Sequence, residues 1–246
     1  MTQTTTAPAT APAIASPRLP AGTPRGSFIV LPGRGDTPSS YERLTNRITV
    51  DGYAVLVLDR ASDPESLRAV IRDALAELSA PVVLLAADTS AAIAAIALAE
   101  PIEGLAGLVI AGAATTDTST DVATLDDEIA LRTACPVHTR VLSSGLAELA
   151  FGAGSDTWGA RWVAAPAAVQ LPSLVIHGGN DSIAALDEVA AATSAWPNRE
   201  LAVVSGGVHD VLNDVHHRSV AAALVQFAER LRLSAAATPI LVVTRD

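Results

Sequence analysis

The feature that most constrains the fold is the stretch 81–99, PVVLLAADTSAAIAAIALA. Its first half predicts a buried strand, and its second half predicts an alanine-rich helix. Small residues, Ala86 and Ser90, stand two places before and two places after Asp88. A tight strand-to-helix elbow requires this spacing, because its strained turn leaves no space for large flanking side chains. We therefore place Asp88 at the apex of an elbow, where a serine is usual.

Short apolar segments alternate with segments of helical periodicity along most of the 246 residues. The apolar segments have no polar face, which is typical of strands in a parallel sheet covered on both sides. Right-handed crossovers join such strands, and ligands bind beyond their carboxyl ends. The sequence thus predicts an α/β fold with a doubly wound, mostly parallel sheet. The expected strands are 27–31, 53–58, 82–85, 105–111, 172–177 and 201–205, and the expected helices are 41–50, 64–79, 90–100, 184–196 and 219–233.

The chain divides into a tail, one domain and a second tail. Residues 1–24 are rich in Thr, Ala and Pro, which predicts a flexible, extended segment. Residues 25–233 contain all the expected strands and helices, and their number suits a single α/β domain. Residues 234–246 follow, and the apolar run at 240–243 is expected to add an edge strand.

Residues 113–170 are the least regular part of the domain. Helices are expected at 125–132 and 141–151, and the glycines and tryptophans between 152 and 162 suggest a covering loop. We expect this segment to form a small lid or insertion over the ligand crevice. A surface helical hairpin without substrate contact is an alternative that the sequence supports equally.

Charge and composition exclude several classes of partner. The net charge of −10 argues against nucleic acid and anionic membranes, because both attract basic surfaces. Hydrophobic residues make up 50% of the chain, yet no apolar run is long enough to span a membrane. The first 24 residues lack the basic start and apolar centre of a signal peptide, so we expect a cytoplasmic protein. A small-molecule substrate is the expected partner, and the oligomeric state stays open.

Neither a metal nor a cofactor is expected. The single cysteine, Cys135, excludes an internal disulfide and stands three residues before His138. That spacing suits a ligand pair or a nucleophile with its base, but without a second pair a zinc site is not expected and a buried structural cysteine is favoured. Gly33 and Gly35 lack the third glycine of a dinucleotide fingerprint, and no Gly-Lys-Ser/Thr sequence occurs.

Three reactive groups follow three of the expected strands at their carboxyl ends: Asp88, Asp181 and His209. Their chain order is nucleophile, acid, histidine. With the loop 31–35 and the segment GVHDVLN at 207–213, this order resembles the α/β-hydrolase fold over roughly residues 26–233. The histidine segment is similar to that of small bacterial hydrolases described as lysophospholipase-like or serine-aminopeptidase-like. An actinobacterial subgroup with Asp-Thr at the elbow is more similar still.

The resemblance implies a role for each of these groups. His209 would be the general base, and Asp181 would fix its tautomer. The backbone N–H of Thr89, with that of Gly33 or Arg34, would form the oxyanion hole. If the site is catalytically active, the Asp88 carboxylate should lie within hydrogen-bond distance of His209 Nε2.

Asp88 leaves three interpretations open. The first is a hydrolase of a small organic substrate with an ester-like bond, in which Asp88 positions water with Ser90 nearby. The second is an enzyme in which Asp88 is the nucleophile, as in epoxide hydrolases and haloalkane dehalogenases. The helpers of those enzymes are missing, because Thr89 replaces a halide-binding Trp, and Tyr41 and Tyr53 lie outside the insertion. The third is a catalytically inactive binding protein, which Ala86 in place of the usual glycine favours.

Overall fold

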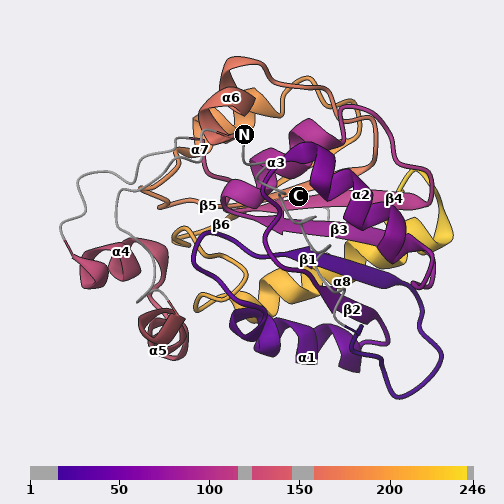
Figure 1. Cartoon of the computed structure of the whole chain (residues 1–246), viewed down its shortest axis with the longest axis horizontal. Coiled ribbons are helices and arrows are strands. Elements are labelled where there is room, and N and C mark those ends of the chain that lie inside the picture. The colour runs from indigo at the N-terminus through magenta and orange to yellow at the C-terminus, as the bar shows by residue number, and fades with distance from the viewer. Residues whose placement is uncertain (1–15, 116–123, 146–157, 243–246) are drawn as a thin grey trace, which may run out of the picture.

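The computed structural model describes residues 16–115, 124–145 and 158–242. The sheet is parallel and six-stranded, in the order β2-β1-β3-β4-β5-β6 (Figure 1). Winding changes direction between β1 and β3, and in such sheets this point marks the ligand crevice. The strands are β1 (Ser27–Leu31), β2 (Ala54–Val57), β3 (Val82–Ala87), β4 (Leu105–Ala111), β5 (Ser173–Gly178) and β6 (Arg199–Val204).

Helices cover both faces of the sheet. One face packs against α2, α3, α6 and α7, and the other against α1 and α8 (Figure 1). The expected strands are confirmed, as are the expected helices α1, α2, α3, α7 and α8, apart from shifts at their ends. The helices are η1 (Pro38–Tyr41), α1 (Glu42–Val50), α2 (Pro64–Leu75), α3 (Thr89–Ala97), α4 (Leu125–Arg132), α5 (Pro136–Gly145), α6 (Trp158–Ala164), α7 (Leu186–Ala192) and α8 (His217–Leu233).

The core has two layers, one on each side of the sheet. Successive residues of a strand point to opposite faces, so Leu84 of β3 enters one layer and Leu85 the other. Both are completely buried, which explains why the strands have no polar face. The register places Leu31 beside Ala86, so the carboxyl ends of β1 and β3 are neighbours. The loops that follow these strands therefore meet.

Several segments differ from the sequence-based expectations. Residues 16–24 are not wholly free of the domain, because Arg18 forms an antiparallel bridge with Val55 of β2. At the other end, residues 240–242 form no strand, and their apolar side chains are exposed. Residues 1–15 and 243–246 lie outside the described residues. Among the described helices, none combines the length and apolar character needed to cross a membrane.

The segment 113–170 contains more helix than expected. α4 lies where it was predicted, but α5 begins at Pro136, because proline suits the first turn of a helix. The region expected to be a glycine-rich loop includes α6, which packs against α3 and buries Trp162 in the core. α6 is therefore part of a helical layer of the domain. Residues 116–123 and 146–157 lie outside the described residues.

Candidate active site

The turn between β3 and α3 is a strained elbow centred on Asp88. Its φ of 51° and ψ of −128° lie in a region that residues other than glycine rarely adopt. Ala86 and Ser90 are fully buried on either side, as their small size predicted. A side chain on Gly33 would place its Cβ 2.9 Å from the Cβ of Asp88, so glycine is required where the β1 loop passes the elbow. The predicted elbow is confirmed.

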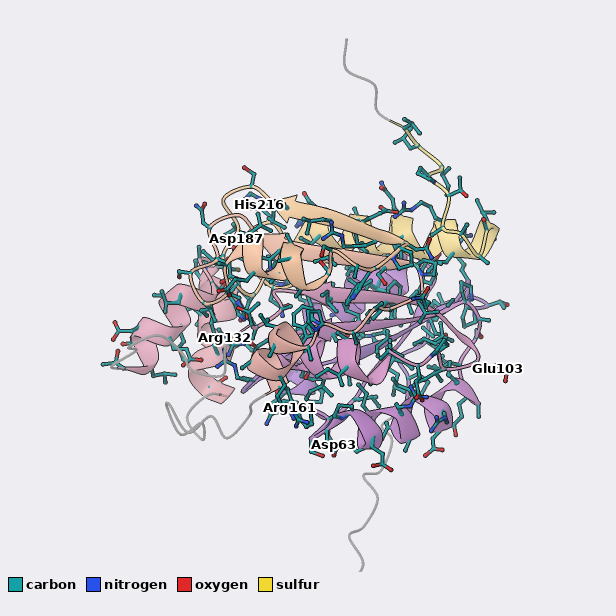
Figure 2. All side chains as sticks on the ribbon, turned by 90° about the horizontal axis from the view of Figure 1, so that it is seen from above. Asp63, Glu103, Arg132, Arg161, Asp187 and His216 are labelled. Carbon is teal, nitrogen blue, oxygen red and sulfur yellow. The ribbon has the colours of Figure 1, made fainter. Side chains whose placement is uncertain are left out.

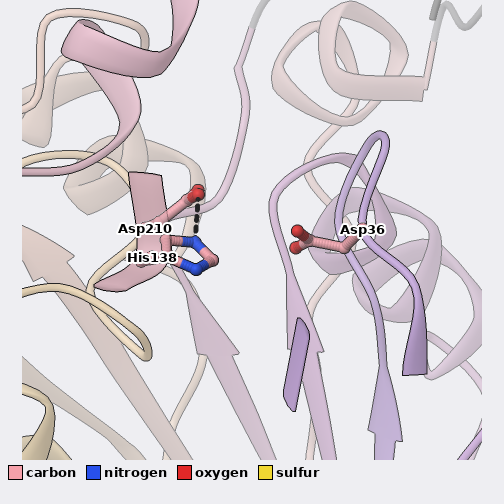
Figure 3. A group of neighbouring side chains, drawn as sticks. All are labelled: Asp36, His138 and Asp210. Atoms are coloured by element: carbon pink, nitrogen blue, oxygen red, sulfur yellow. Dashed lines mark hydrogen bonds and ion pairs between the residues drawn. The ribbon is translucent and has the colours of Figure 1, made fainter. Parts of the chain in front are cut away.

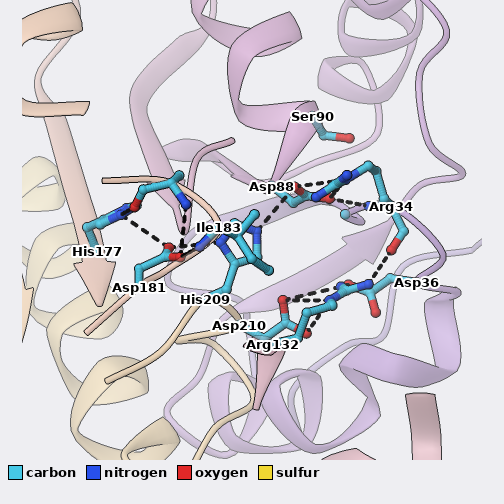
Figure 4. Close-up of polar contacts among 12 residues, drawn as sticks. Arg34, Asp36, Asp88, Ser90, Arg132, His177, Asp181, Ile183, His209 and Asp210 are labelled. Carbon is cyan, nitrogen blue, oxygen red and sulfur yellow. Dashed lines mark hydrogen bonds and ion pairs between the residues drawn. The ribbon is translucent and has the colours of Figure 1, made fainter. Parts of the chain in front are cut away.

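The structure brings Asp88, Asp181 and His209 together in one chain of hydrogen bonds (Figure 4). His209 Nε2 donates to Asp88 Oδ1 over 3.2 Å, which is the hydrogen bond expected of a catalytically active site. His209 Nδ1 donates to Asp181 Oδ2 over 2.8 Å. The imidazole therefore lies between two carboxylates, each bonded to a different ring nitrogen.

Asp181 is held in place by its own turn and lies beside a histidine that sequence reasoning missed. Its Oδ1 accepts the backbone N–H groups of Ile183 and Ala184. His177, at the end of β5, is fully buried and lies with Nε2 3.2 Å from Asp181 Oδ2, while the same nitrogen donates to Ala184 O. The position of His177 four residues before Asp181 is visible in the sequence, but the direction of its side chain toward Asp181 is not.

The expected oxyanion hole is only partly formed, and Asp88 itself occupies it. The backbone N–H of Arg34 donates to Asp88 Oδ2 over 2.7 Å, and the Arg34 Nε lies 2.9 Å from the same oxygen. The N–H of Gly33 turns away and donates to the Tyr41 hydroxyl instead. Within the described residues, no hydrogen bond from the Thr89 N–H is found. Of the three residues predicted to supply the oxyanion hole, Arg34 is thus the one whose backbone N–H donates to the Asp88 carboxylate.

Ser90 is not a reactive neighbour of Asp88. Its hydroxyl donates to the carbonyl of Pro32 over 2.6 Å, and the side chain is fully buried. Ser90 therefore ties the start of α3 to the loop after β1. The first interpretation placed Ser90 near Asp88, and the structure directs its hydroxyl to Pro32 and not to the Asp88 carboxylate.

Charges around His209 keep it protonated. Burial disfavours the imidazolium, but the charges of Asp181 and Asp88 outweigh that effect and raise the pKa of His209 to about 10. Burial would likewise raise the pKa of Asp88, yet the charge of Arg34 and the bond from His209 hold that pKa well below its usual range. At neutral pH the site thus contains two carboxylates around one imidazolium, with the Arg34 guanidinium beside Asp88.

A second buried charge cluster lies next to these residues (Figures 3 and 4). Arg132 of α4 donates to the Asp210 carboxylate and, over 2.7 Å, to the carbonyl of Arg34. Its guanidinium also lies 3.6 Å from Asp36 Oδ2. His138 of α5 donates to Asp210 over 3.0 Å. Figure 2 shows Arg132 where α4 meets the body of the domain.

Asp36, His138 and Asp210 could offer ligand atoms to a cation, since these atoms lie within 4.8 Å of one another. Arg132 already supplies positive charge there, so a metal ion would have to displace its guanidinium. Cys135 is not part of this cluster. It is buried, and its sulfur accepts a bond from Arg43 over 3.4 Å, which agrees with the structural role that was favoured.

The described part of the insertion is therefore anchored to the site loops. Besides the contacts of Arg132 and His138, the Thr133 hydroxyl and the Ala134 N–H both donate to Asp214. Asp214 lies five residues after His209 in the same loop. The hairpin thus contacts the loop that carries Arg34 and Asp36 and the loop that carries His209.

Asp88 and His209 are almost closed off from solvent, since Asp88 is 2% exposed and His209 1% exposed. A cavity of about 10 Å³ lies beside them. This volume suits one water molecule. The cavity is lined by Asp36, Tyr41, Ala87, Asp88, Ala111, His209, Asp210, Val211, Leu212 and Asn213.

No protein-family model and no curated protein sequence matches the chain. Solved structures do match it. A soluble variant of monoglyceride lipase from Saccharomyces cerevisiae superposes with a TM-score of 0.72 at 13% identity, covering 87% of this chain and 90% of that one. A monoacylglycerol lipase from Paleococcus ferrophilus gives a TM-score of 0.65 at 16% identity, covering 86% and 96%. A bromoperoxidase from Bacillus anthracis gives 0.63 at 16% identity, covering 87% and 94%.

Proposed function

This chain has the α/β-hydrolase fold, as its sequence predicted, and we propose that it is a hydrolase of a small organic substrate. In this proposal Asp88 is the nucleophile, His209 the base and Asp181 its partner. The bond that breaks joins a saturated carbon to a leaving group, as in an epoxide or an alkyl halide. The observation that carries the proposal is the place of His209 between two carboxylates.

The protonation of His209 decides the order of events. With a pKa of about 10, His209 is an imidazolium at neutral pH and cannot take a proton from water. Its basicity returns when one neighbouring carboxylate loses its charge. Alkylation of Asp88 does this, because an ester is neutral. The base therefore becomes active only after Asp88 has reacted.

The contacts of Arg34 support the same chemistry. Hydrolysis of an ester at Asp88 develops negative charge on an oxygen of Asp88 itself. The Arg34 N–H, 2.7 Å from Oδ2, and the Arg34 guanidinium already face that oxygen. A serine hydrolase would instead need these donors free for the substrate carbonyl. Oδ1, on the His209 side, is then the oxygen that attacks carbon.

The proposed reaction has two steps, alkylation of Asp88 and hydrolysis of the resulting ester. Asp88 Oδ1 forms a bond to the substrate carbon, and the leaving group departs with the electron pair of the broken bond. His209 then releases its proton, since Asp88 no longer holds a charge beside it; the proton passes to the alkoxide of an opened epoxide or, with a halide, to solvent water. Water attacks the ester carbonyl carbon while His209 accepts one of its protons. The alcohol departs, and Asp88 and His209 return to carboxylate and imidazolium.

An ester substrate fits this site less well, although two of the similar structures are those of lipases. Attack of a carboxylate on an acyl carbon gives an anhydride, which is a poor intermediate. The helper groups of known enzymes with an aspartate nucleophile are not reproduced, since Thr89 follows Asp88. Tyr41, however, lines the cavity beside Asp88 and His209, although it lies outside the insertion.

Trapping of the covalent intermediate tests the proposal. The variant His209→Gln is incubated with propylene oxide, butyl bromide and phenyl acetate, and the intact protein mass and the modified peptide are determined. We expect an adduct on Asp88 with the epoxide or the halide, because the second step lacks its base. In wild-type turnover, water labelled with heavy oxygen should leave the label in the Asp88 carboxylate.

Two variants serve as controls. Asp88→Asn should give no adduct, and His216→Gln, which changes an exposed histidine, should behave as wild type. An adduct formed only with phenyl acetate, or one on another residue, would contradict the proposed chemistry.

A second candidate is a binding protein without catalysis. The observation that favours it is the burial of Asp88 and His209, with both oxygens of Asp88 already bonded. The absence of any adduct in His209→Gln, together with no wild-type turnover of the three probes, would favour this candidate.

A further inference from the structure

One oxygen of Asp36 is buried without a partner among the described residues. This is Oδ1, whereas Oδ2 accepts the Tyr41 hydroxyl over 2.9 Å and lies 3.6 Å from the Arg132 guanidinium. A buried carboxylate oxygen without a hydrogen bond is costly, and an ordered water is the usual partner in such places. The unpaired Oδ1 of Asp36 therefore indicates that a water molecule is bound beside it.

The cavity beside the reactive groups supplies a place for this water. Its volume of about 10 Å³ suits one molecule, and Asp36, Tyr41, Asp88 and His209 all line it. The polar side chains of Asp36, Tyr41, Asp88 and His209 therefore border the same small space. Asp36, which carries the unpaired oxygen, thus lines the same cavity as Asp88 and His209.

We propose that this cavity holds the water that hydrolyses the Asp88 ester, and that Asp36 Oδ1 orients it. The inference rests on the proposed function and adds Asp36 as a residue that contacts a reacting molecule. One O–H of the water donates to Asp36 Oδ1, and the other points at His209 Nε2. The water oxygen then faces the carbonyl carbon of the ester.

The step balances without another reactant. The water oxygen bonds to the carbonyl carbon, and His209 Nε2 takes the proton that points at it. The tetrahedral intermediate collapses, and the bond between that carbon and the alkyl oxygen breaks. The alkoxide takes a proton from His209, and the remaining proton of the acid passes to His209. Asp36 accepts a hydrogen bond from the water throughout and takes no proton from it.

The variant Asp36→Asn tests this role, because an amide nitrogen donates where the carboxylate oxygen accepts. With the probe that alkylates Asp88 in His209→Gln, Asp36→Asn should still form the adduct. Hydrolysis should slow by about 10²-fold, since a misoriented water reacts poorly. The adduct on Asp88 should therefore accumulate during turnover, with kcat reduced and the rate of adduct formation unchanged.

Matched variants separate this effect from a general loss of structure. Asp73→Asn makes the same change on the exposed face of α2 and should leave kcat unchanged. Tyr41→Phe removes the donor to Asp36 without changing a charge, and a smaller accumulation is expected. Thermal unfolding of each variant reports whether it folds. A high-resolution crystal structure of the wild type should show a water near Asp36 Oδ1 and His209 Nε2.

The outcomes distinguish the two proposals. If His209→Gln forms the adduct but Asp36→Asn neither accumulates it nor lowers kcat by more than about twofold, the role of Asp36 is wrong and the proposed function stands. If no probe alkylates Asp88, the proposed function is wrong and the catalytic role of the water fails with it. A crystal structure without a water in the cavity would overturn the inference whatever the activity.

Discussion

At the scale of single residues, the chemistry of this site depends on which charges surround one imidazole. His209 has a carboxylate on each ring nitrogen, and Arg34 balances the charge of Asp88. In a serine hydrolase the same histidine would face one carboxylate and one neutral hydroxyl. In the proposed mechanism, an aspartate at position 88 in place of a serine therefore changes both the nucleophile and the protonation of the base.

Removal of either carboxylate should lower the pKa of His209. The wild-type value is raised to about 10, and Asp88→Asn or Asp181→Asn removes one of the charges that raise it. We expect the pKa to fall by about one unit or more in each variant. Titration of the His209 ring signals by NMR measures this directly, with Asp73→Asn as the control. A wild-type histidine that titrates near 6.5 would contradict the arrangement.

At the scale of elements, loops that follow the strands pass each other with almost no free space. Gly112, directly after β4, has a φ of +51°, and a Cβ there would lie 2.1 Å from the carbonyl oxygen of His209. The strand end and the histidine loop thus depend on each other. Both the backbone conformation and the close approach require glycine at this position.

Gly112→Ala should therefore destabilise the domain and displace His209. The strained φ and the clash together are expected to lower the free energy of unfolding by about 2 kcal/mol or more. Urea denaturation measures this loss. Gly22→Ala is the matched control, since nothing lies within 4 Å of its Cβ. Equal stability of the two variants would show that the histidine loop can move away from β4 at little cost.

At the scale of the whole molecule, ionisable groups at the carboxyl ends of the strands link stability to pH. The folded state binds the His209 proton more tightly than the unfolded state, in which the pKa is near 6.5. The resulting stabilisation is complete below about pH 6.5 and is lost as the pH rises through about 10. The contribution of Asp88 to stability depends on pH in the opposite direction. Its pKa is lowered in the folded state, so this contribution is lost in acid.

The free energy of unfolding of the wild type should therefore fall between about pH 6.5 and 10. His209→Gln cannot bind this proton, so its stability should depend less on pH in that range. Chemical denaturation at a series of pH values gives the two profiles, and other titrating groups cancel in their difference. Parallel profiles would mean that His209 has a similar pKa in the folded and unfolded states.

The sequence alone determined the order of the strands and of the helices that cover the sheet other than α6, the elbow at Asp88, and the Asp88, Asp181 and His209 set. These features are local, because periodicity and the spacing of small residues report on neighbouring positions in the chain. Strand ends could be placed in one crevice because parallel strands end at the same edge of a sheet. The expected edge strand at 240–243 shows the limit, since an apolar run does not reveal whether a partner strand is available.

Only the tertiary structure decided how the site is completed. Arg34 turns its side chain onto Asp88, Ser90 turns away to Pro32, and His177 supports Asp181. Arg132 joins loops that lie 98 and 78 residues away from it in the chain. Such contacts depend on how distant segments pack, and a pattern within one segment carries no record of them. Packing also set the charge of His209, because its pKa follows from the two carboxylates that the fold places beside it.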